Sequence, residues 1–494
     1  MKNELYPAVN AHHFVVDGRR FFIDGDTGYF CEETELTKKI IEMLPCTFEY
    51  ACEKLSCDYT VEEIKHEYED IKKAYENKVI GYKDPALYQG VDIKEEDFLN
   101  SKVLLNLWLN VSNDCNMRCI YCFEHGGDYG KTKRIMSIDR IKDCIDFWYK
   151  YLNKDAKDIY VIFFGGEPLL NKKGIKFAVK YVRELLSKHN IRPHFSITSN
   201  ATLLDEDFAE FLVENKIPVT ISIDGGRHIQ NKNRPLAGGS KSFDIVNKNV
   251  KNLMKIRQNL TARVTLVHED VGHLVDIVKD LWEMGFGQVQ YDLVSTDDPK
   301  LKITEEDLVT IEEQVKIIAD LMYENVIHDQ WKVLRNLTKI VDCINFPVWD
   351  LTGCSYYAPY TIMVDPTGEI YKCQRLMDEE YCTGDIYNGI KWNKFYLKKP
   401  INEECEACWG KSICAAGCAQ VRLMNTGDIN KNSKLWCDHV KIITNEALKF
   451  YAKLYMYYPE ILYLCFLPEY RQPFWYIKNS ARSSGSLSVM CFLR

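Results

Sequence analysis

A regular alternation of apolar, strand-like runs with helical stretches, from Leu104 to Leu293, constrains the fold more than any other feature of the sequence. Each helix would carry the chain back across the sheet, so consecutive strands are expected to be parallel, with right-handed crossovers. We therefore predict an α/β fold, a partial (β/α)6 barrel that is TIM-like. The predicted strands are 104–111, 159–164, 194–199, 218–223, 262–267 and 288–293, and the predicted helices are 138–152, 173–188, 206–215, 243–257 and 272–284.

Polar motifs follow the first four predicted strands. They are the cysteine loop Asn113–Cys122, the run Gly165-Gly166-Glu167-Pro168, the run Thr198-Ser199-Asn200 and the run Ser222-Ile223-Asp224-Gly225. In parallel α/β folds the reactive groups lie at the carboxyl ends of the strands, in the loops that follow them. The sequence therefore predicts one site, built from these four loops.

The cysteine loop has the spacing C-x3-C-x2-C, formed by Cys115, Cys119 and Cys122. A structural zinc site requires four ligands, whereas an iron–sulfur cube held by three cysteines keeps one iron open. We expect a [4Fe–4S] cluster here. A zinc knuckle, or three thiols without a ligand role, is the alternative.

A second group of seven cysteines lies towards the carboxyl end of the chain. Nineteen cysteines are present in all, and no signal peptide precedes them, so the chain is expected to be cytoplasmic and its cysteines to bind metal rather than form disulfides. The net charge of −8 gives no broad reason to bind nucleic acid, and no apolar run approaches the ~20 residues that would span a membrane. The seven cysteines are Cys354, Cys373, Cys405, Cys408, Cys414, Cys418 and Cys437.

The first cysteine loop, with Tyr121 before its third cysteine, and the Gly-Gly-Glu-Pro motif resemble those of the radical S-adenosylmethionine (SAM) enzymes over roughly 104–295. In that family SAM chelates the open iron, and its reductive cleavage yields a 5′-deoxyadenosyl radical that abstracts hydrogen from carbon. The resemblance implies that Gly165, Gly166 and Glu167 contact the methionine amino group. It also places Asn200, Ser222 and Arg234 near SAM. Asp224 is expected to be a turn former.

The seven later cysteines, with Gly368 between the first two, resemble the SPASM extension of radical SAM enzymes, which binds two auxiliary [4Fe–4S] clusters. This implies that the chain carries three clusters in all. Cys343 is a candidate fourth ligand of the first auxiliary cluster, which would otherwise keep an iron open to a substrate thiolate. A zinc ribbon using Cys405 to Cys418 is the alternative. By this resemblance the first auxiliary cluster is held by Cys354, Cys373 and Cys418, and the second by Cys405, Cys408, Cys414 and Cys437.

The chain before the barrel has three short strand-like runs followed by helical patterns, which predicts a small winged-helix-like unit or a generic α+β lid. It resembles the PqqD-like domains with which radical SAM–SPASM peptide maturases bind a leader peptide, by adding a strand to the edge of a sheet. The predicted domains are 1–90 for this unit, 100–300 for the barrel, 301–340 for a helical connector, 341–447 for the SPASM domain and 448–494 for an irregular aromatic tail.

These features favour a maturase that installs a thioether crosslink in a ribosomally made, cysteine-containing peptide, as the maturases of sactipeptides and ranthipeptides do. Its expected partners are that peptide and an electron donor such as ferredoxin or flavodoxin. A sulfatase maturase that makes formylglycine is the second hypothesis. In that family an Asp commonly follows the second cysteine of the first auxiliary cluster and serves as a base, whereas this chain has Gln374. A non-catalytic zinc-binding protein is the third.

Overall fold

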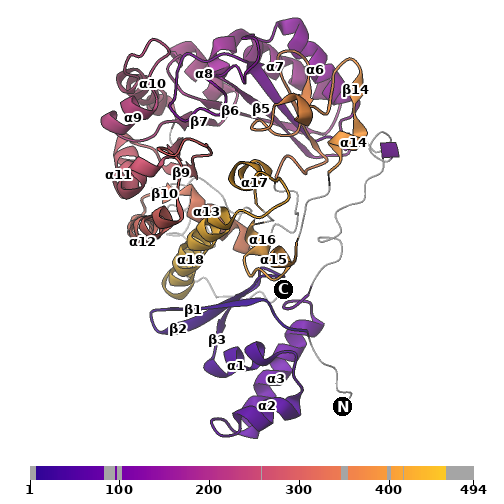
Figure 1. Cartoon of the computed structure of the whole chain (residues 1–494), viewed down its shortest axis with the longest axis vertical. Helices are drawn as coiled ribbons and strands as arrows, with labels where there is room; N and C mark the ends of the chain where they lie inside the picture. Colours follow the sequence, from indigo (N-terminus) through magenta and orange to yellow (C-terminus); the bar gives the residue numbers. More distant parts are fainter. Residues whose placement is uncertain are drawn as a thin grey trace, which may run out of the picture.

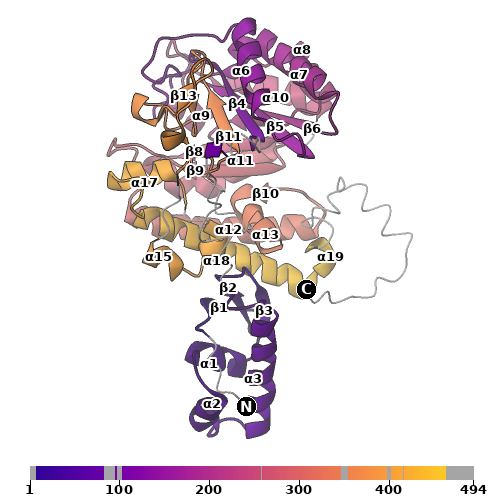
Figure 2. The same cartoon turned by 90° about the vertical axis from the view of Figure 1, so that its right-hand side faces the viewer.

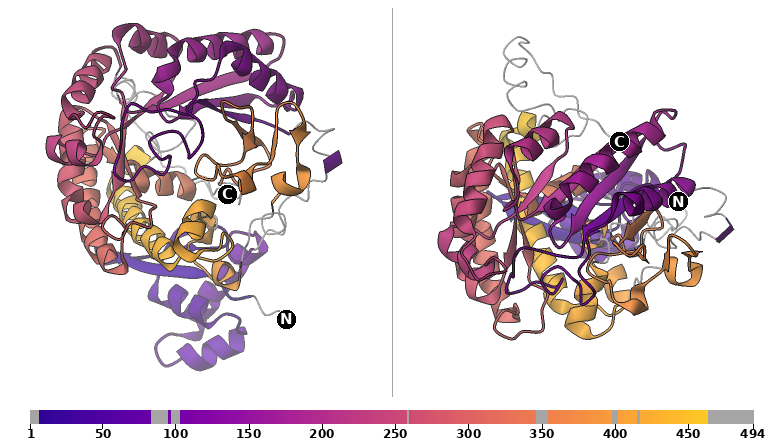
Figure 3. Two further views of the ribbon diagram at one scale, coloured as in Figure 1. Left: turned by 45° about the horizontal axis from the view of Figure 1, so that its top comes forward. Right: turned by 90° about the horizontal axis from the view of Figure 1, so that it is seen from above.

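A nine-stranded sheet organises the larger part of the molecule. The computed structural model describes residues 7–82, 95–96, 103–257, 259–345, 354–397, 402–414 and 417–462. Six parallel strands lie side by side in chain order and confirm the predicted partial barrel (Figures 1 and 3). They are β4 (Asn106–Ser112), β5 (Asp158–Gly165), β6 (Arg192–Ser199), β7 (Val219–Ser222), β8 (Thr261–Leu266) and β9 (Gln288–Leu293).

Helices cover the outer face of this sheet (Figure 1). Most of them bury an apolar stripe: in α6, for example, Ile141, Ile145 and Trp148 are fully buried and recur at helical spacing. Side chains cap the first turn of some of these helices, as where the Ser137 hydroxyl accepts a hydrogen bond from the Arg140 N–H. The helices are α6 (Ile138–Lys150), α7 (Lys172–Leu186), α8 (Glu206–Glu214), α9 (Arg227–Asn233), α10 (Phe243–Ile256) and α11 (Leu274–Met284), with the 3-10 turns η1 (Pro168–Asn171) and η2 (His268–His273).

Three short strands extend the sheet beyond the six that the sequence predicts. β10 (Val333–Leu334) pairs in parallel with β9, β11 (Thr361–Val364) pairs in parallel with β4, and β12 (Ile370–Tyr371) is antiparallel to β11. Runs of two to four residues are too short to show a period, so the sequence did not predict them. Because of these pairings, the segment between Cys354 and Cys373 lies against the first barrel strand.

Long helices close the side of the barrel below β9. α12 (Glu305–Ile327) and α13 (Arg335–Asn345) both pack against α18 (Lys434–Tyr457). The prediction of an irregular tail from 448 is therefore wrong for its first part: α18 buries Leu448, Phe450, Ala452 and Leu454, and α19 (Pro459–Ile461) follows. Residues 463–494 lie outside the described part. The remaining elements are short: η3 (Glu379–Tyr381), β13 (Gly384–Asp385), β14 (Gly389–Ile390), α14 (Trp392–Phe395), α15 (Glu403–Glu406), α16 (Lys411–Cys414) and α17 (Ala419–Thr426).

The N-terminal unit forms a separate lobe with its own core (Figure 2). An antiparallel sheet in the order β1-β2-β3 precedes three helices, an order compatible with both the winged-helix-like unit and the α+β lid. The helix α2, which carries the buried Ala51 and Leu55, was not predicted, because an eight-residue helix gives a weak periodic signal. The elements are β1 (Ala11–Val16), β2 (Arg19–Asp24), β3 (Phe30–Glu33), α1 (Glu35–Met43), α2 (Phe48–Leu55) and α3 (Val61–Glu76).

This unit is attached to the cysteine-rich segment by specific contacts. The His12 ring stacks on Trp409, with ring centroids 3.8 Å apart, and its Nε2 donates a hydrogen bond to the side-chain oxygen of Asn445 in α18 at 2.7 Å. The buried Asp26 carboxylate forms an ion pair with Lys411. The sheet of the N-terminal unit is thereby held next to the loop that joins Cys408 to Cys414.

Across the residues that the structure describes, no helix is both long enough and apolar enough to cross a membrane.

Candidate active site

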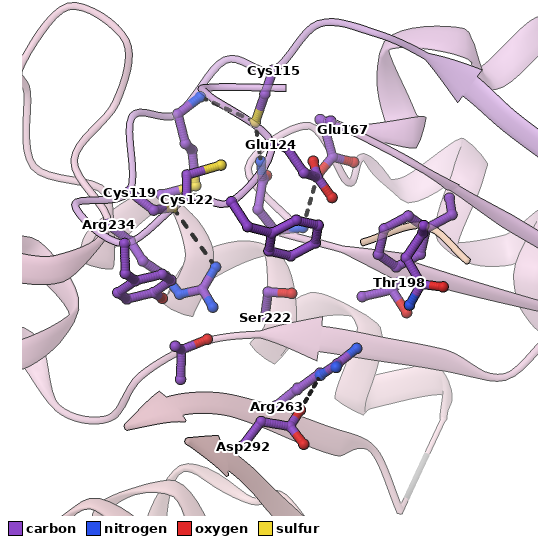
Figure 4. Close-up of a pocket in the computed structure, with 18 of the residues that line it drawn as sticks. Cys115, Cys119, Cys122, Glu124, Glu167, Thr198, Ser222, Arg234, Arg263 and Asp292 are labelled. Carbon is purple, nitrogen blue, oxygen red and sulfur yellow. Dashed lines mark hydrogen bonds and ion pairs between the residues drawn. The ribbon is translucent and has the colours of Figure 1, made fainter. Parts of the chain in front are cut away.

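A cavity opens where the barrel strands end; together with the open solvent at its mouth it has a volume of about 980 Å³. The four predicted loops all line it, as do the ends of β8 and β9 and the segment after Cys373. Figure 4 shows the three cysteines of the first loop on one side and the Arg263–Asp292 pair on the opposite side, with Ser222 between them. The structure therefore brings the four predicted loops together around one cavity.

The first cysteine loop is held in place by main-chain hydrogen bonds to the segment after α9. The Arg118 N–H donates to the Pro235 carbonyl at 2.8 Å, and the Ile120 N–H donates to the Asn233 carbonyl at 3.0 Å. Gly127 has φ of +102°, and a Cβ there would lie 2.7 Å from the Cβ of Cys115. A glycine is therefore needed where the chain returns beside the first cysteine.

The donor set and its surroundings suit a metal cluster. Burial raises the pKa of the Cys115 thiol and raises that of Cys119 to about 12. Such thiols ionise when a cation takes the place of the proton, because a coordinating thiol is deprotonated by the metal. Within the described ranges, no three His, Cys, Asp or Glu side chains are arranged to share a single metal ion.

The Gly-Gly-Glu loop packs directly against the cysteine loop. A Cβ at Gly165, where φ is +128°, would overlap the Ser112 carbonyl, and one at Gly166 would overlap the Asp114 carbonyl. The glycines therefore permit close approach of two main chains, and both also line the cavity. This accounts for the Gly-Gly pair in terms of the fold alone, apart from any contact with a ligand.

Glu167 is buried and ties the second loop to the third. Its carboxylate accepts hydrogen bonds from the Leu169 N–H at 2.9 Å, the Ser199 hydroxyl at 2.8 Å and the Asn200 N–H at 2.8 Å. Burial nevertheless raises the pKa of Glu167 to about 6. The Asn200 amide in turn donates to Asn116 at 3.1 Å, beside Cys115. These contacts hold the loops around the first cysteine in fixed relation.

Asp224 has a different role from the one expected of it. It is fully buried, and its carboxylate forms an ion pair with Arg234 at 3.0 Å and accepts hydrogen bonds from the Tyr121 hydroxyl at 2.5 Å and the Thr265 N–H at 3.0 Å. The prediction of a turn former is therefore wrong. Arg234 lies 5.4 Å from the Tyr121 ring centroid and 3.9 Å from the Cys119 sulfur, so this pair links the fourth loop to the cysteine loop.

Several cavity residues were not predicted from the sequence. Arg263 of β8 and Asp292 of β9 form an ion pair of 2.7 Å, and burial raises the pKa of Glu124, which follows the third cysteine, to about 8. Gln374 and Arg375 reach the cavity from the segment after Cys373. For the Arg263–Asp292 pair, the available signal was one charged residue inside each of the predicted strands 262–267 and 288–293.

Electrostatic effects link the later cysteines in two groups. Burial raises the pKa of Cys373 to about 12, with Cys418 and Cys354 adding to the effect, so these three lie near one another. Likewise burial raises the pKa of Cys437, with contributions from Cys405 and Cys408.

The structure does not assign a role to Cys343 or Cys414, the remaining two cysteines predicted to bind an auxiliary cluster. The charged groups that act on Cys343 are Asp342 and Lys339 of its own helix, α13. Cys414 lies at the end of α16, next to residues outside the described part. The roles of both remain predictions.

Comparison with known proteins identifies the class. The model of the Radical SAM superfamily matches residues 109–281. A cysteine-type anaerobic sulfatase-maturating enzyme of Clostridium perfringens (strain 13 / Type A) is 25% identical over 63% of this chain and 87% of its own. An uncharacterised protein of Methanocaldococcus jannaschii is 30% identical over 61% of this chain and 94% of its own. The structure of native anSMEcpe with bound AdoMet and Cp18Cys peptide has a TM-score of 0.59 and 22% identity, covering 72% of this chain and 98% of that one.

The chain belongs to the radical SAM superfamily and is an enzyme of that superfamily.

Proposed function

We propose that this enzyme is a SPASM-type maturase that installs a thioether between a cysteine sulfur and a carbon atom of a ribosomally made peptide. The observation that carries the proposal is Gln374, which lines the cavity. An Asp commonly stands at this place in the sulfatase maturases and acts as a base, whereas a glutamine amide accepts no proton at neutral pH. A substrate thiol that binds an open iron of the first auxiliary cluster would already have lost its proton, so its attack on carbon would not require a base at that position.

We assign the catalytic cluster to the first cysteine loop. Cys115, Cys119 and Cys122 would each bind one iron of a [4Fe–4S] cluster. SAM would lie against Gly165, Gly166, Glu167, Asn200, Ser222 and Arg234, all of which line the cavity. When bound, SAM and the cluster supply a 5′-deoxyadenosyl radical that abstracts hydrogen from carbon.

The protein's own contribution is to fix the loops around that position. Glu167 holds the third loop through Ser199 and Asn200. The Asp224–Arg234 pair holds the fourth loop and Tyr121. Because these groups are buried, they keep their geometry when a ligand enters and require little reorganisation.

The later cysteines are assigned two auxiliary [4Fe–4S] clusters, which makes three per chain. Cys354, Cys373 and Cys418 would hold the first, with either Cys343 or a substrate thiolate as the fourth ligand. Cys405, Cys408, Cys414 and Cys437 would hold the second. These clusters would take up the electron released when the thioether forms, and a ferredoxin or flavodoxin would supply the electron that starts each turnover.

The N-terminal unit is assigned to the leader of the precursor peptide. β1 and β3 are the edge strands of its sheet, and an extended peptide can add a strand to such an edge. The contacts of His12 with Trp409 and Asn445 fix this sheet on the side of the enzyme that carries the later cysteines.

Sulfatase maturation is the second candidate function. It is supported by the similarity to the Clostridium perfringens enzyme, which extends over 87% of that relative. A serine or cysteine of a sulfatase peptide would be oxidised to an aldehyde, without any crosslink.

The reaction products distinguish thioether formation from sulfatase maturation. We expect that the reconstituted enzyme converts the peptide encoded by a short cysteine-rich reading frame beside its gene into a product that has lost two hydrogens and one alkylatable thiol. An aldehyde that reacts with a hydrazine, formed on a sulfatase peptide, would instead establish the second function. Iron and sulfide analysis of anaerobically purified protein tests the zinc-binding alternative, since three cubes require about twelve irons per chain.

A further inference from the structure

Three arginines line the cavity, and two of them are already paired. Arg234 forms its ion pair with Asp224 at 3.0 Å, and Arg263 forms its ion pair with Asp292 at 2.7 Å. In the part of the chain that the structure describes, the Arg375 guanidinium has neither an ion-pair partner nor a hydrogen-bond partner; it lies 5.3 Å from the centroid of the Phe123 ring. A cation held against an aromatic ring and facing a cavity is available to a ligand.

The position of Arg375 can be fixed from the groups on which its charge acts. Burial opposes ionisation of Asp292, but Arg263 and Arg375 outweigh it and lower the pKa of that carboxyl. Phe123, in contrast, directly follows the cysteine loop. Arg375 therefore lies beside Phe123 at the wall of the cavity, and its charge acts on Asp292 at the end of β9.

Asp292 does not satisfy Arg375, because its nearest cationic atom is the Nε of Arg263. The guanidinium of arginine presents a planar fork of N–H groups that matches the two oxygens of a carboxylate. A carboxylate entering the cavity would thus find two donors on Arg375 and would leave the Arg263–Asp292 pair intact.

We propose that Arg375 binds the side-chain carboxylate of an aspartate or glutamate in the substrate peptide, next to the residue that the enzyme modifies. The inference rests on the proposed function in one respect, that the occupant of the cavity is a peptide. Gln374, which precedes it, adds an amide that can pair with the peptide main chain at the same place. The substrate class is thereby narrowed to cysteine-containing peptides with an acidic residue at the reacting segment.

The charge of Arg375 also acts on Glu124 of the same cavity, but among the described residues the two form no ion pair. Two further anions could be the partner of Arg375. One is the carboxylate of SAM. The other is an auxiliary cluster, because Arg375 also acts on Cys373 and Cys418. Each partner predicts a different loss when Arg375 is replaced.

The test uses the reconstituted, SAM-loaded enzyme and four capped amino acids as probes: N-acetyl-glutamate amide, N-acetyl-aspartate amide, and the glutamine and asparagine counterparts. Titration calorimetry should show that the two acids bind about tenfold or more tightly than the amides, as expected for a hydrogen bond to a charged group. Arg375→Gln should abolish this preference and leave SAM affinity and iron content unchanged. Arg375→Lys should keep part of it. Arg227→Gln is the matched control, since Arg227 pairs with Asp244 outside the cavity.

Four results would overturn the proposal. The wild-type enzyme could bind acids and amides equally, or bind none of the four probes. Arg375→Gln could lower SAM affinity, which would assign the arginine to SAM, or lower the iron content, which would assign it to a cluster. Failure of the proposed function gives a separate result: the acid preference would persist while no thioether product formed.

Discussion

The buried Asp224–Arg234 pair gives the sharpest test of how the site is held together. The Arg234 and Asp224 side chains are 9% and 0% exposed, and the pair joins the fourth loop to Tyr121 and to the sulfur of Cys119. Removing one member of a buried pair leaves an uncompensated charge, which costs about 3–5 kcal/mol. Asn at position 224 keeps the shape and can still accept one hydrogen bond, so we expect a loss of about 3 kcal/mol for Asp224→Asn.

A double-mutant cycle separates this pairing from unrelated damage. We expect Arg234→Met to cost a similar amount, and the double variant to cost less than the sum by at least about 2 kcal/mol, because neither charge then remains buried alone. The free energy of unfolding is measured by urea titration of the reconstituted proteins, followed by circular dichroism. Strictly additive losses would refute the reasoning, since they would mean that the two residues act independently.

Three further perturbations follow from the structure. Asp26→Asn should weaken the attachment of the N-terminal unit, because it removes the carboxylate that pairs with the buried Lys411. Hydrogen exchange in segments 11–26 and 405–414 should then be faster. Glu32→Gln, which breaks an exposed ion pair on the same sheet, should leave the exchange rates unchanged. Gly166→Ala should cost about 1–3 kcal/mol, because the added Cβ overlaps main-chain atoms that cannot move aside; a variant with wild-type stability and SAM binding would contradict this. His439 is fully buried, and burial lowers its pKa to about 4. On acidification the His439 ring is protonated in the unfolded chain before it is protonated in the folded one, so its contribution to the free energy of unfolding is complete above pH ~6.5 and is lost below it. The free energy of unfolding should therefore be about 1.4 kcal/mol lower at pH ~5.5 than at pH ~7.5. His439→Gln should lack this decrease.

The barrel could be predicted because its signal is periodic and long. Six apolar runs separated by helices leave few topologies, and parallel strands bring their carboxyl ends to one edge. The placement of the cysteine loop beside Gly165, Gly166 and Glu167 followed from that rule alone. The bounds of the strands then differ from the predicted ones by no more than a few residues.

The missed features depend on contacts between distant parts of the chain. β10 and β12 are two-residue strands that exist only because a neighbouring strand is there to pair with them. The role of Asp224 follows from its meeting with Arg234 and Tyr121 in space, whereas the sequence Ile-Asp-Gly is also typical of a turn. Arg375 enters the cavity only because the segment after β12 folds back beside Phe123. The periodicity of the sequence contains no information about such contacts between distant residues.

The continuation of α18 beyond residue 447 has a different cause. Its aromatic residues suggested an irregular tail, but Phe450, Tyr451 and Leu454 recur at helical spacing and pack against the barrel core. For a segment of this length, periodicity is a better guide to secondary structure than composition.

The central claim is that the three cysteines of the first loop support cleavage of SAM. It is tested most directly by measuring 5′-deoxyadenosine formed from SAM and dithionite by the anaerobically reconstituted enzyme, by Cys115→Ala and by Cys144→Ala. Cys144 is a buried thiol of α6 outside the site and serves as the matched control. We predict that the wild-type enzyme and Cys144→Ala form deoxyadenosine and that Cys115→Ala forms none. Deoxyadenosine produced by Cys115→Ala at the wild-type rate would contradict the account.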